Sequence, residues 1–449
     1  MKKFLAMLLA LTMVLALCAC GAKDEPAEAT PEAAPFVVTA VKDGYAWTAD
    51  VAALVSDPIA ADALKVGVIT LHDENSSYDR NFIDAAKEVF AELGLKDENV
   101  MFKANVGEDE SCYDAAAELA DAGCNVIFSD SYGHEPYMIQ AAAEFPEVDF
   151  VSATSDRALT EGLSNYHNAF ADIYQGRFLA GVAAGMKLNE MIAAGEFTAD
   201  EAKIGYVGAK PYSEVISGYT SFYLGVRYIC PSVTMEVIYT NSWYDEALEK
   251  EAANKLISNG CKLISEHADS MGAPTACETA GVPNVSYNLS FEESCPNTYL
   301  IGSRINWRPY FRVMVEARLN GTAIPTDWSG ALDNDAVQAL AINESVAAAG
   351  TAEKVAEVQA MILNGSLNVF DTATFTVTND DEGANLFNNN SSVATVDANG
   401  VLTGYLADVY NDGTFTGETD AIKDGAFEES QFRSAPYFYA IIDGITILG

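Results

Sequence analysis

The sequence is poor in basic residues. Only 25 Lys and Arg stand against 65 Asp and Glu in 449 residues, so the formal net charge is −40 at pH 7. A protein that binds DNA or RNA needs a basic face to release counterions from the phosphates. The composition therefore argues against a nucleic-acid partner and is typical of a surface charge that keeps a protein soluble.

Motifs of common enzymes and metal sites are also missing. The chain has no G-x-G-x-x-G, no P-loop, no G-x-S-x-G and no C-x-x-C. Its four histidines, His72, His134, His167 and His267, lack the spacing of metal ligands. We therefore expect no metal, no cofactor and no catalysis. A surface enzyme with a dispersed Ser-His-Asp set stays an alternative, because such sets need not be local in sequence.

The spacing of Cys112 and Cys124 argues against a disulfide between them. Cys112 and Cys124 bracket a predicted helix, which would separate them by about 18 Å at 1.5 Å per residue. A disulfide requires α-carbons within about 7 Å, so these two are not expected to be bonded. The other pairings stay open.

The amino end contains a short uncharged run, residues 4–17, which follows Lys2 and Lys3. A membrane-spanning helix needs about 20 apolar residues, so residues 1–19 are instead predicted to be a signal peptide. The sequence LCACG at 17–21 resembles a bacterial lipobox, with Cys20 as the lipid-bearing residue. Residues 20–35, rich in Ala, Glu, Pro and Thr, are predicted to form a flexible tether. We expect an extracytoplasmic protein, anchored to the bacterial cell membrane through lipid only.

The body alternates short apolar runs with amphipathic helices, first from residue 65 and again from residue 203. This pattern predicts an α/β fold with two doubly wound parallel-sheet lobes and a hinge. Residues 115–127 and 252–264 match each other, with a glycine ending the helix and a cysteine opening the strand in both copies.

The predicted boundaries assign discontinuous segments to each lobe. Lobe 1 comprises residues 36–185 with 289–325, and lobe 2 comprises 186–288 with 326–370. Residues 371–449 are predicted to be a small β-rich appendage, with a hairpin turn at Asn399-Gly400.

Ligands of open parallel sheets bind outside the carboxyl ends of the strands, and here the loops after the strands are aromatic and polar. Several rings with carboxylates and amides between them suit a flat heteroaromatic ligand, since each stacked ring contributes about 0.5–1.5 kcal/mol beyond burial. For any single ring, such as Trp243, attachment of a helix to its sheet is the alternative. The candidate ligand-binding residues are Asp73, Ser77, Tyr78, Tyr132, Asn168, Trp243, Asp269, Asn288 and Trp307.

Four phrases carry a family resemblance: YHNAF at 166–170, IYQGRFLAG at 173–181, TNSWYD at 240–245 and NWRPY at 306–310. They resemble the basic membrane protein family of substrate-binding lipoproteins, and the likeness runs from about residue 64 to 377. The resemblance implies a type I periplasmic-binding-protein fold, an ABC transporter permease as partner and a purine nucleoside or base as ligand.

Individual positions refine this expectation. Ser77-Tyr78-Asp79 is similar to the family's Ser-Phe-Asn phrase, which makes Tyr78 the stacking candidate, and residues 267–272 match the loop that cups the ligand. Asn288 replaces an aspartate of the nucleoside receptors, and the region of Trp307 replaces a lysine. Because those groups hold the sugar, the departures favour a bare base or another heterocycle. A type I receptor for a sugar or an amino acid also stays open, and less so an adhesin.

Overall fold

The computed structural model describes residues 53–377, 392–407 and 419–448 in full, and elsewhere the backbone of four short strands. Those strands are β1 (Phe36–Thr39), β2 (Ala46–Ala49), β15 (Asn379–Asp380) and β16 (Gly383–Ala384). The predicted signal peptide, tether and Cys20 lie outside the described residues. Pro35–Gly449 form one compact unit. In the described part, no helix has both the length and the apolar character needed to cross a membrane.

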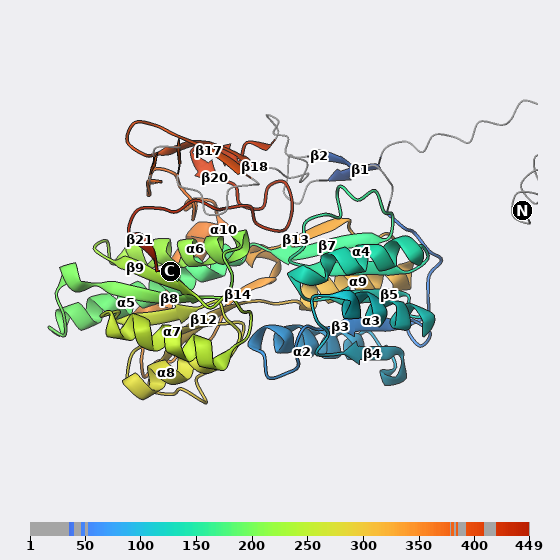
Figure 1. Ribbon diagram of the computed structural model, residues 1–449, viewed down its shortest axis with the longest axis horizontal. Helices are drawn as coiled ribbons and strands as arrows, with labels where there is room; N and C mark the ends of the chain where they lie inside the picture. Colours follow the sequence, from blue (N-terminus) through green and yellow to red (C-terminus); the bar gives the residue numbers. More distant parts are fainter. Residues whose placement is uncertain are drawn as a thin grey trace, which may run out of the picture. The chain divides into compact units, whose positions relative to one another are not determined.

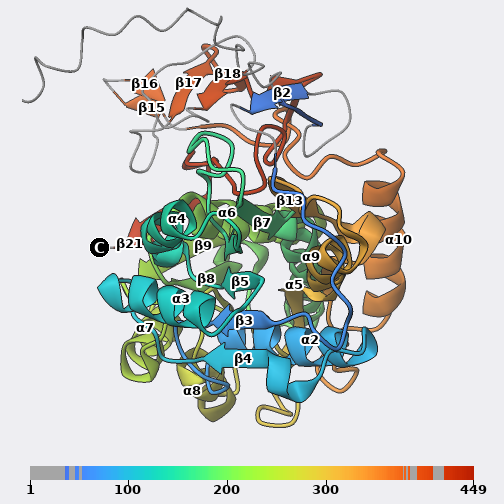
Figure 2. The same ribbon diagram turned by 90° about the vertical axis from the view of Figure 1, so that its right-hand side faces the viewer.

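The first lobe is built on a six-stranded parallel sheet (Figure 1). In spatial order its strands are β4 (Val100–Lys103), β3 (Val66–Ile69), β5 (Val126–Ser129), β6 (Asp149–Ala153), β7 (Tyr166–Ala171) and β13 (Asp327–Gly330). One face is covered by α2 (Ser77–Glu92) and α9 (Arg308–Asn320), and the other by α3 (Glu110–Asp121) and α4 (Glu135–Glu144), as Figure 2 shows.

Alternate residues of these strands enter two different hydrophobic cores, as the two-residue period of a strand requires. In β5, Phe128 joins the core under α2 and α9, whereas Ile127 joins the core under α3 and α4. In β6, Val151 and Phe150 alternate in the same way. Both faces are therefore apolar, which explains why the strands read as continuous hydrophobic runs.

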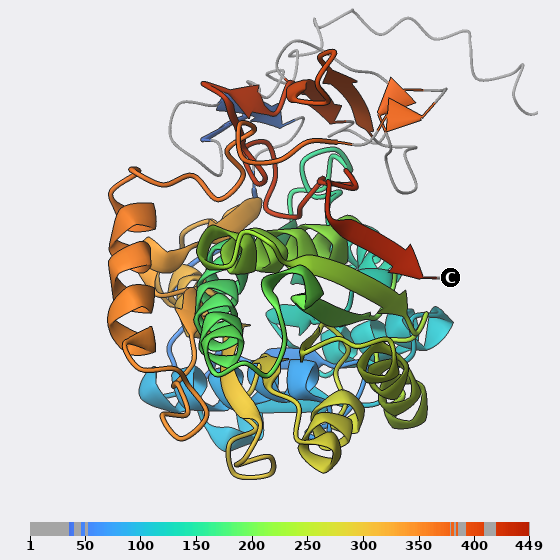
Figure 3. The same cartoon turned by 90° about the vertical axis from the view of Figure 1, so that its left-hand side faces the viewer.

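The second lobe repeats this plan in a seven-stranded sheet. In spatial order its strands are β14 (Val337–Ala339), β12 (Tyr299–Ile305), β11 (Asn284–Tyr287), β10 (Leu263–Glu266), β8 (Lys203–Gly208), β9 (Thr234–Tyr239) and β21 (Ile445–Leu448). Only β14 runs antiparallel to its neighbour among the described pairs of this sheet. Its helices are α5 (Ile173–Ala193) and α6 (Ser213–Ile229) on one face and α7 (Glu246–Ser258) and α8 (Gly272–Ala280) on the other (Figure 3). A further helix, α10 (Thr351–Leu363), packs on α5.

The first five strands of each lobe share one spatial order, 2-1-3-4-5, which is a doubly wound arrangement. The predicted two-lobed α/β fold is thus confirmed. The two matching segments occupy equivalent places, since α3 leads into β5 and α7 leads into β10. Gly123 and Gly260 follow these helices at φ 85° and 91°, a left-handed conformation that glycine adopts without steric cost.

The division of the chain between the lobes differs from the predicted boundaries. The chain crosses between lobes at 172, at 306–307 and at 331–336, because β7 and β13 lie in the first sheet whereas β12 and β14 lie in the second. Helix α5 also packs on the second sheet, through α6 and β12. A strand's apolar pattern reports burial but not which of two similar sheets it joins, so the exchange of β12 and β13 was not visible in the sequence.

The carboxyl-terminal residues are only partly an appendage. The predicted hairpin is present as β17 (Ser392–Val396) and β18 (Leu402–Ala407), followed by β19 (Ile422–Lys423) and β20 (Ala426–Phe427). The last strand, β21, instead pairs with β9 at the edge of the second sheet (Figure 3). Residues 429–438 before it are buried. This end of the chain is therefore an integral part of the second lobe.

Helix caps fix the turns between strand ends and helices. The Ser76 hydroxyl accepts the backbone N–H of Asp79 at 3.3 Å at the start of α2, and the Asp245 carboxylate accepts that of Ala247 at 3.1 Å at the start of α7. Tyr78 stands in the first turn of α2, and Trp243 stands two residues before Asp245, the cap of α7. Both rings are thereby placed at the carboxyl ends of their sheets.

Candidate functional site

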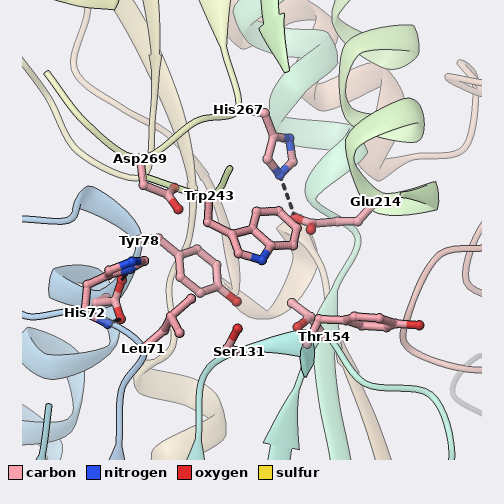
Figure 4. Close-up of a pocket in the computed structure, with 11 residues that line it drawn as sticks. Leu71, His72, Tyr78, Ser131, Thr154, Glu214, Trp243, His267 and Asp269 are labelled. Carbon is pink, nitrogen blue, oxygen red and sulfur yellow. Dashed lines mark hydrogen bonds and ion pairs between the residues drawn. The ribbon is translucent and has the colours of Figure 1, made fainter. Parts of the chain in front are cut away.

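The carboxyl ends of strands from both sheets meet around one cavity (Figure 4). It contains about 360 Å³ of space not occupied by atoms, part of it open to solvent. The first lobe lines it with Leu71, His72, Tyr78, Asp79, Ser131, Tyr132 and Thr154, and the second with Glu214, Trp243, His267 and Asp269. Every one of these residues follows the end of a strand, the position at which doubly wound sheets bind ligands.

Two aromatic rings reach the cavity from opposite lobes. The Tyr78 hydroxyl donates a hydrogen bond to the backbone carbonyl of Asp130 at 2.7 Å. The Trp243 indole N–H donates to Glu108 Oε1 at 3.2 Å. Figure 4 shows both rings projecting into the same space, with Asp269 beside them. Since the polar ends of both side chains are bonded to protein, their ring faces remain for contact with a ligand.

Two buried carboxyl groups in the cavity have pKa values that are shifted in opposite directions. Burial raises the pKa of Asp79, but hydrogen bonds from the His72 ring, from the Ser76 hydroxyl at 2.5 Å and from the His72 backbone N–H at 2.7 Å outweigh it and hold the pKa below its ordinary value. Burial raises the pKa of Asp269 well above its ordinary value, and the charges of Asp79, Glu249 and Glu214 add to this. No described residue donates a hydrogen bond to the Asp269 side chain. Asp269 is thus the buried polar group of the cavity that a ligand would satisfy.

His267 and Glu214 form the polar end of the cavity (Figure 4). Arg177 Nη2 lies 3.0 Å from His267 Nδ1, and arginine can only donate. His267 Nδ1 is therefore the acceptor, and Nε2 carries the proton that His267 donates to Glu214 Oε1 at 3.1 Å. Burial lowers the pKa of His267, which keeps the ring neutral. Burial raises the pKa of Glu214, but the hydrogen bond from His267, the charge of Arg177 and the hydrogen bond from Tyr287 lower it overall, which favours the carboxylate.

Thr154 lines the cavity with a strained backbone. Its φ is 61°, a left-handed conformation that a β-branched residue rarely adopts. Its N–H donates to the Ala169 carbonyl at 3.0 Å and its hydroxyl to the Ala153 carbonyl at 2.5 Å. Strain of this kind costs about 1–3 kcal/mol and concentrates at ligand sites.

Four predicted residues line the cavity together: Tyr78, Tyr132, Trp243 and Asp269. Asp73 is not among the lining residues; its carboxylate accepts the backbone N–H of Asn75 at 3.0 Å and closes a turn. Ser77 is buried, and its N–H donates to the Asp269 carbonyl at 3.0 Å. Ser77 therefore joins the two lobes through its backbone and not through its hydroxyl.

The other three predicted residues lie away from the cavity. Trp307 is only 1% exposed and stacks on Phe82 with ring centroids 4.3 Å apart, so it belongs to the first lobe's core. The Asn168 side chain is buried and accepts the Ala158 N–H at 2.7 Å. Asn288 is buried at φ 64° and donates its N–H to the Ser303 carbonyl at 2.9 Å. These three predictions are corrected, because polar context in the sequence did not reveal that the side chains turn inwards.

Seven lining residues are absent from the nine candidates: Leu71, His72, Asp79, Ser131, Thr154, Glu214 and His267. Asp79 and Glu214 are acidic residues in the first turns of α2 and α6, and both helices follow the first strand of their sheet. That shared position was a usable signal. No sequence signal marked Thr154, since its backbone conformation depends on contacts with β7.

The six cysteines of the body are free and buried. The prediction that Cys112 and Cys124 are not bonded to each other is confirmed.

Comparisons with known proteins agree with the two-lobed geometry. Residues 66–338, more than half of the chain, match the family described as ABC transporter substrate-binding protein PnrA-like. A purine-binding protein of Brucella abortus is 32% identical over 266 residues, which cover 59% of this chain and 71% of that protein. A Haloferax volcanii protein named for glucose binding in an ABC transporter is 29% identical over 258 residues, covering 58% of this chain and 62% of that protein.

Solved structures support the fold alone. An ABC transporter solute-binding protein from Conexibacter woesei aligns with a TM-score of 0.56 at 22% identity, covering 68% of this chain and 98% of that one. One from Aeropyrum pernix aligns with a TM-score of 0.56 at 15% identity, covering 71% and 94%. These matches agree with the type I periplasmic-binding-protein fold that the family phrases imply, here with a β-rich carboxyl-terminal region.

Proposed function

The chain belongs to the PnrA-like family of ABC transporter substrate-binding proteins, and from this premise we propose that it captures a purine between Tyr78 and Trp243 and delivers it to an ABC importer. The observation that carries the proposal is the convergence of these two rings, from opposite lobes, on a cavity that also contains the unpaired carboxyl group of Asp269. The family's role is binding and not catalysis.

The polar groups around the rings suit the edge of a purine. Asp269 and Glu214 offer acceptors for ring N–H and amino groups, and the hydroxyl of Ser131 lies among the lining groups as well. Flat rings stack on aromatic faces while their edges are hydrogen-bonded, a combination that orients the ligand. The similarity to the purine-binding protein of Brucella abortus supports the same ligand class.

Capture requires the lobes to move apart. The cavity is narrow, and Trp243, Tyr132 and Asp269 stand close around it. Three crossing segments join the lobes, an arrangement that suits hinge closure around a ligand. In this proposal the closed, loaded form is the one that the permease recognises.

A sugar receptor is the second candidate function. The relative from Haloferax volcanii is named for glucose binding, and the carboxylates Asp79 and Glu214 could accept hydrogen bonds from sugar hydroxyls. Sugars also pack on aromatic rings. The two candidates therefore differ mainly in which ligand stabilises the protein.

Anchoring is part of the proposal. Substrate-binding proteins of ABC importers act outside the cytoplasm, and we propose that lipid on Cys20 holds this one at the membrane. In cell fractions, the wild type should partition with membranes and Cys20→Ala should be released. Equal partitioning of both would contradict the anchor while leaving ligand capture unaffected.

Thermal melting with single added compounds tests ligand capture. A ligand at 100 times its Kd that binds only the folded state stabilises it by about 2.7 kcal/mol. We expect adenine or guanine to raise the Tm, and glucose and amino acids to leave it unchanged. A shift with glucose alone would favour the sugar receptor.

A further inference from the structure

A second chamber adjoins the ligand cavity. It contains about 410 Å³ of space not occupied by atoms, part of it open to solvent. It shares Tyr132, Thr154, Glu214 and Trp243 with the first cavity. Its remaining wall includes Ala435, Pro436 and Tyr439, which lie beyond residue 338, where the match to the family ends.

These residues belong to a segment, 431–439, that is fixed to both lobes and is called the strap below. Towards the first lobe, Arg433 pairs with Asp156 at 3.1 Å and the Ser434 N–H donates to Asp327 Oδ2 at 2.7 Å. Towards the second lobe, the Ser213 hydroxyl donates to the Pro436 carbonyl at 2.9 Å. Arg433 and Ala435 are each 4% exposed. The strap is therefore built into the body at the edge of the cleft.

The second chamber is lined by negatively charged hydrogen-bond acceptors and by tyrosine hydroxyls. Asp156 and Glu214 supply carboxylates, and Tyr132, Tyr212 and Tyr439 supply rings with hydroxyls. No described residue forms a hydrogen bond with the hydroxyl of Tyr439. Arg433 of the strap is already paired with Asp156. Hydroxyl and amino groups of a ligand can donate hydrogen bonds to these carboxylates. A phosphate would instead be repelled by the two negative charges, and no unpaired cation within the described ranges of the chain lines the chamber to offset them.

We propose that the strap completes the ligand site, so that the second chamber holds a hydroxyl- or amino-bearing substituent of the ring bound in the first. This inference rests on the proposed capture of a purine. It assigns Ala435, Pro436 and Tyr439 to ligand recognition, and it makes the carboxyl-terminal region a determinant of specificity. The shared residue Thr154, with its strained backbone, stands where the two chambers meet.

Calorimetric titration of the full chain with adenine, adenosine and AMP tests the strap. Adenosine adds a hydroxylated substituent to adenine, and AMP adds a phosphate to that substituent. We expect adenosine to bind more tightly than adenine, and AMP at least tenfold more weakly than adenosine. Tyr439→Phe removes one hydroxyl and should weaken adenosine binding about 3- to 10-fold while leaving adenine unchanged. Ala435→Leu narrows the second chamber and should weaken adenosine binding more strongly than Tyr439→Phe does, again without changing adenine binding.

Tyr228→Phe is the matched control, because Tyr228 is 47% exposed on α6 and lines neither chamber. It should change none of the three affinities. If adenine binds but adenosine binds no better, or if the strap variants change both affinities alike, the strap does not form a substituent site. If neither adenine nor adenosine binds the wild type, the proposed purine function itself fails, and the strap proposal fails with it.

Discussion

The indole N–H of Trp243 donates a hydrogen bond to Glu108 Oε1 at 3.2 Å, and the two residues come from different lobes. The other oxygen of Glu108 pairs with Lys210 of the second lobe at 3.1 Å. Within the first lobe, Glu108 also accepts hydrogen bonds from the Ser131 hydroxyl at 2.7 Å and the Gly133 N–H at 3.1 Å. One carboxylate thus connects the cavity walls, and burial, which raises its pKa, is outweighed by these partners, which lower it.

Loss of the Glu108 charge should weaken ligand retention. Glu108→Gln replaces the ion pair with Lys210 by a weaker contact between a charged and a neutral group, and hydrogen bonds that involve charged groups contribute about 1.5–3 kcal/mol. We expect adenine to bind about tenfold more weakly, mainly through a faster dissociation rate in stopped-flow fluorescence. Glu110→Gln, two residues away and exposed, is the control and should leave the rate unchanged. An unaltered dissociation rate in Glu108→Gln would show that this contact does not hold the lobes together.

The Tyr78 ring should contribute to affinity through its face. Tyr78→Ala removes the stacking surface and should weaken purine binding at least about tenfold, from the loss of burial and about 0.5–1.5 kcal/mol of ring contact. Tyr78→Phe keeps the ring but loses the hydrogen bond to the Asp130 carbonyl, so it should stay within about threefold of wild type. The Kd values of Tyr78→Ala, Tyr78→Phe and the wild type for adenine, measured by calorimetry, separate the contribution of the ring from that of the hydroxyl. Equal losses in both variants would mean that the hydroxyl matters and that stacking does not.

The raised pKa of Asp269 predicts how the stability of the protein changes with pH. A carboxyl group whose pKa is higher in the folded than in the unfolded state favours folding when protonated, and this contribution is lost as pH rises above the ordinary value of about 4 towards the folded pKa. Asp269→Asn removes the cost of a buried charge. Without ligand, this variant should gain stability relative to wild type at pH 8 and gain less at pH 5, as measured by urea unfolding.

The same substitution should weaken purine binding, because Asn has one acceptor oxygen and an NH2 donor where the Asp269 carboxyl group has two oxygens for the ligand's N–H and amino groups. Glu246→Gln, in the exposed first turn of α7, serves as the control for a lost negative charge. A stability change in Asp269→Asn that is the same at both pH values would contradict the assigned cause of the pKa shift.

Truncation of Trp307 should mainly reduce stability, whereas truncation of Trp243 should mainly reduce purine affinity. Trp307 is 1% exposed and stacked on Phe82, so Trp307→Ala should cost about 3–5 kcal/mol of unfolding free energy. Trp243 lines the cavity, so Trp243→Ala should cost less stability but most of the purine affinity. Denaturation and titration of both variants check this. Comparable stability losses in the two would place Trp243 in the core as well.

This contrast shows what the sequence could and could not predict. The strand and helix alternation, the glycine-ended helices at Gly123 and Gly260 and the hairpin at Asn399-Gly400 depend on local chemistry, and all are found. Trp243 and Trp307 both stand in polar phrases just before a helix. Which ring points into a cavity depends on the packing of Phe82 from a distant helix, and this packing is not encoded locally.

The same reasoning applies to the lobe boundaries and the strap. β12 and β13 belong to different sheets because of the partners they pair with, β11 and β7. Residues 431–439 contain no regular strand or helix, so periodicity could not place them beside the cavity. Contacts across large sequence separations, such as that of Arg433 with Asp156, appear only in the folded chain.

The most direct test of purine capture is a calorimetric titration of adenine and of glucose into the wild type and into Trp243→Ala. The account predicts saturable adenine binding to the wild type, at least tenfold weaker binding to the variant, and no heat of binding with glucose. Saturable glucose binding without adenine binding, or adenine binding that Trp243→Ala leaves unchanged, would contradict it.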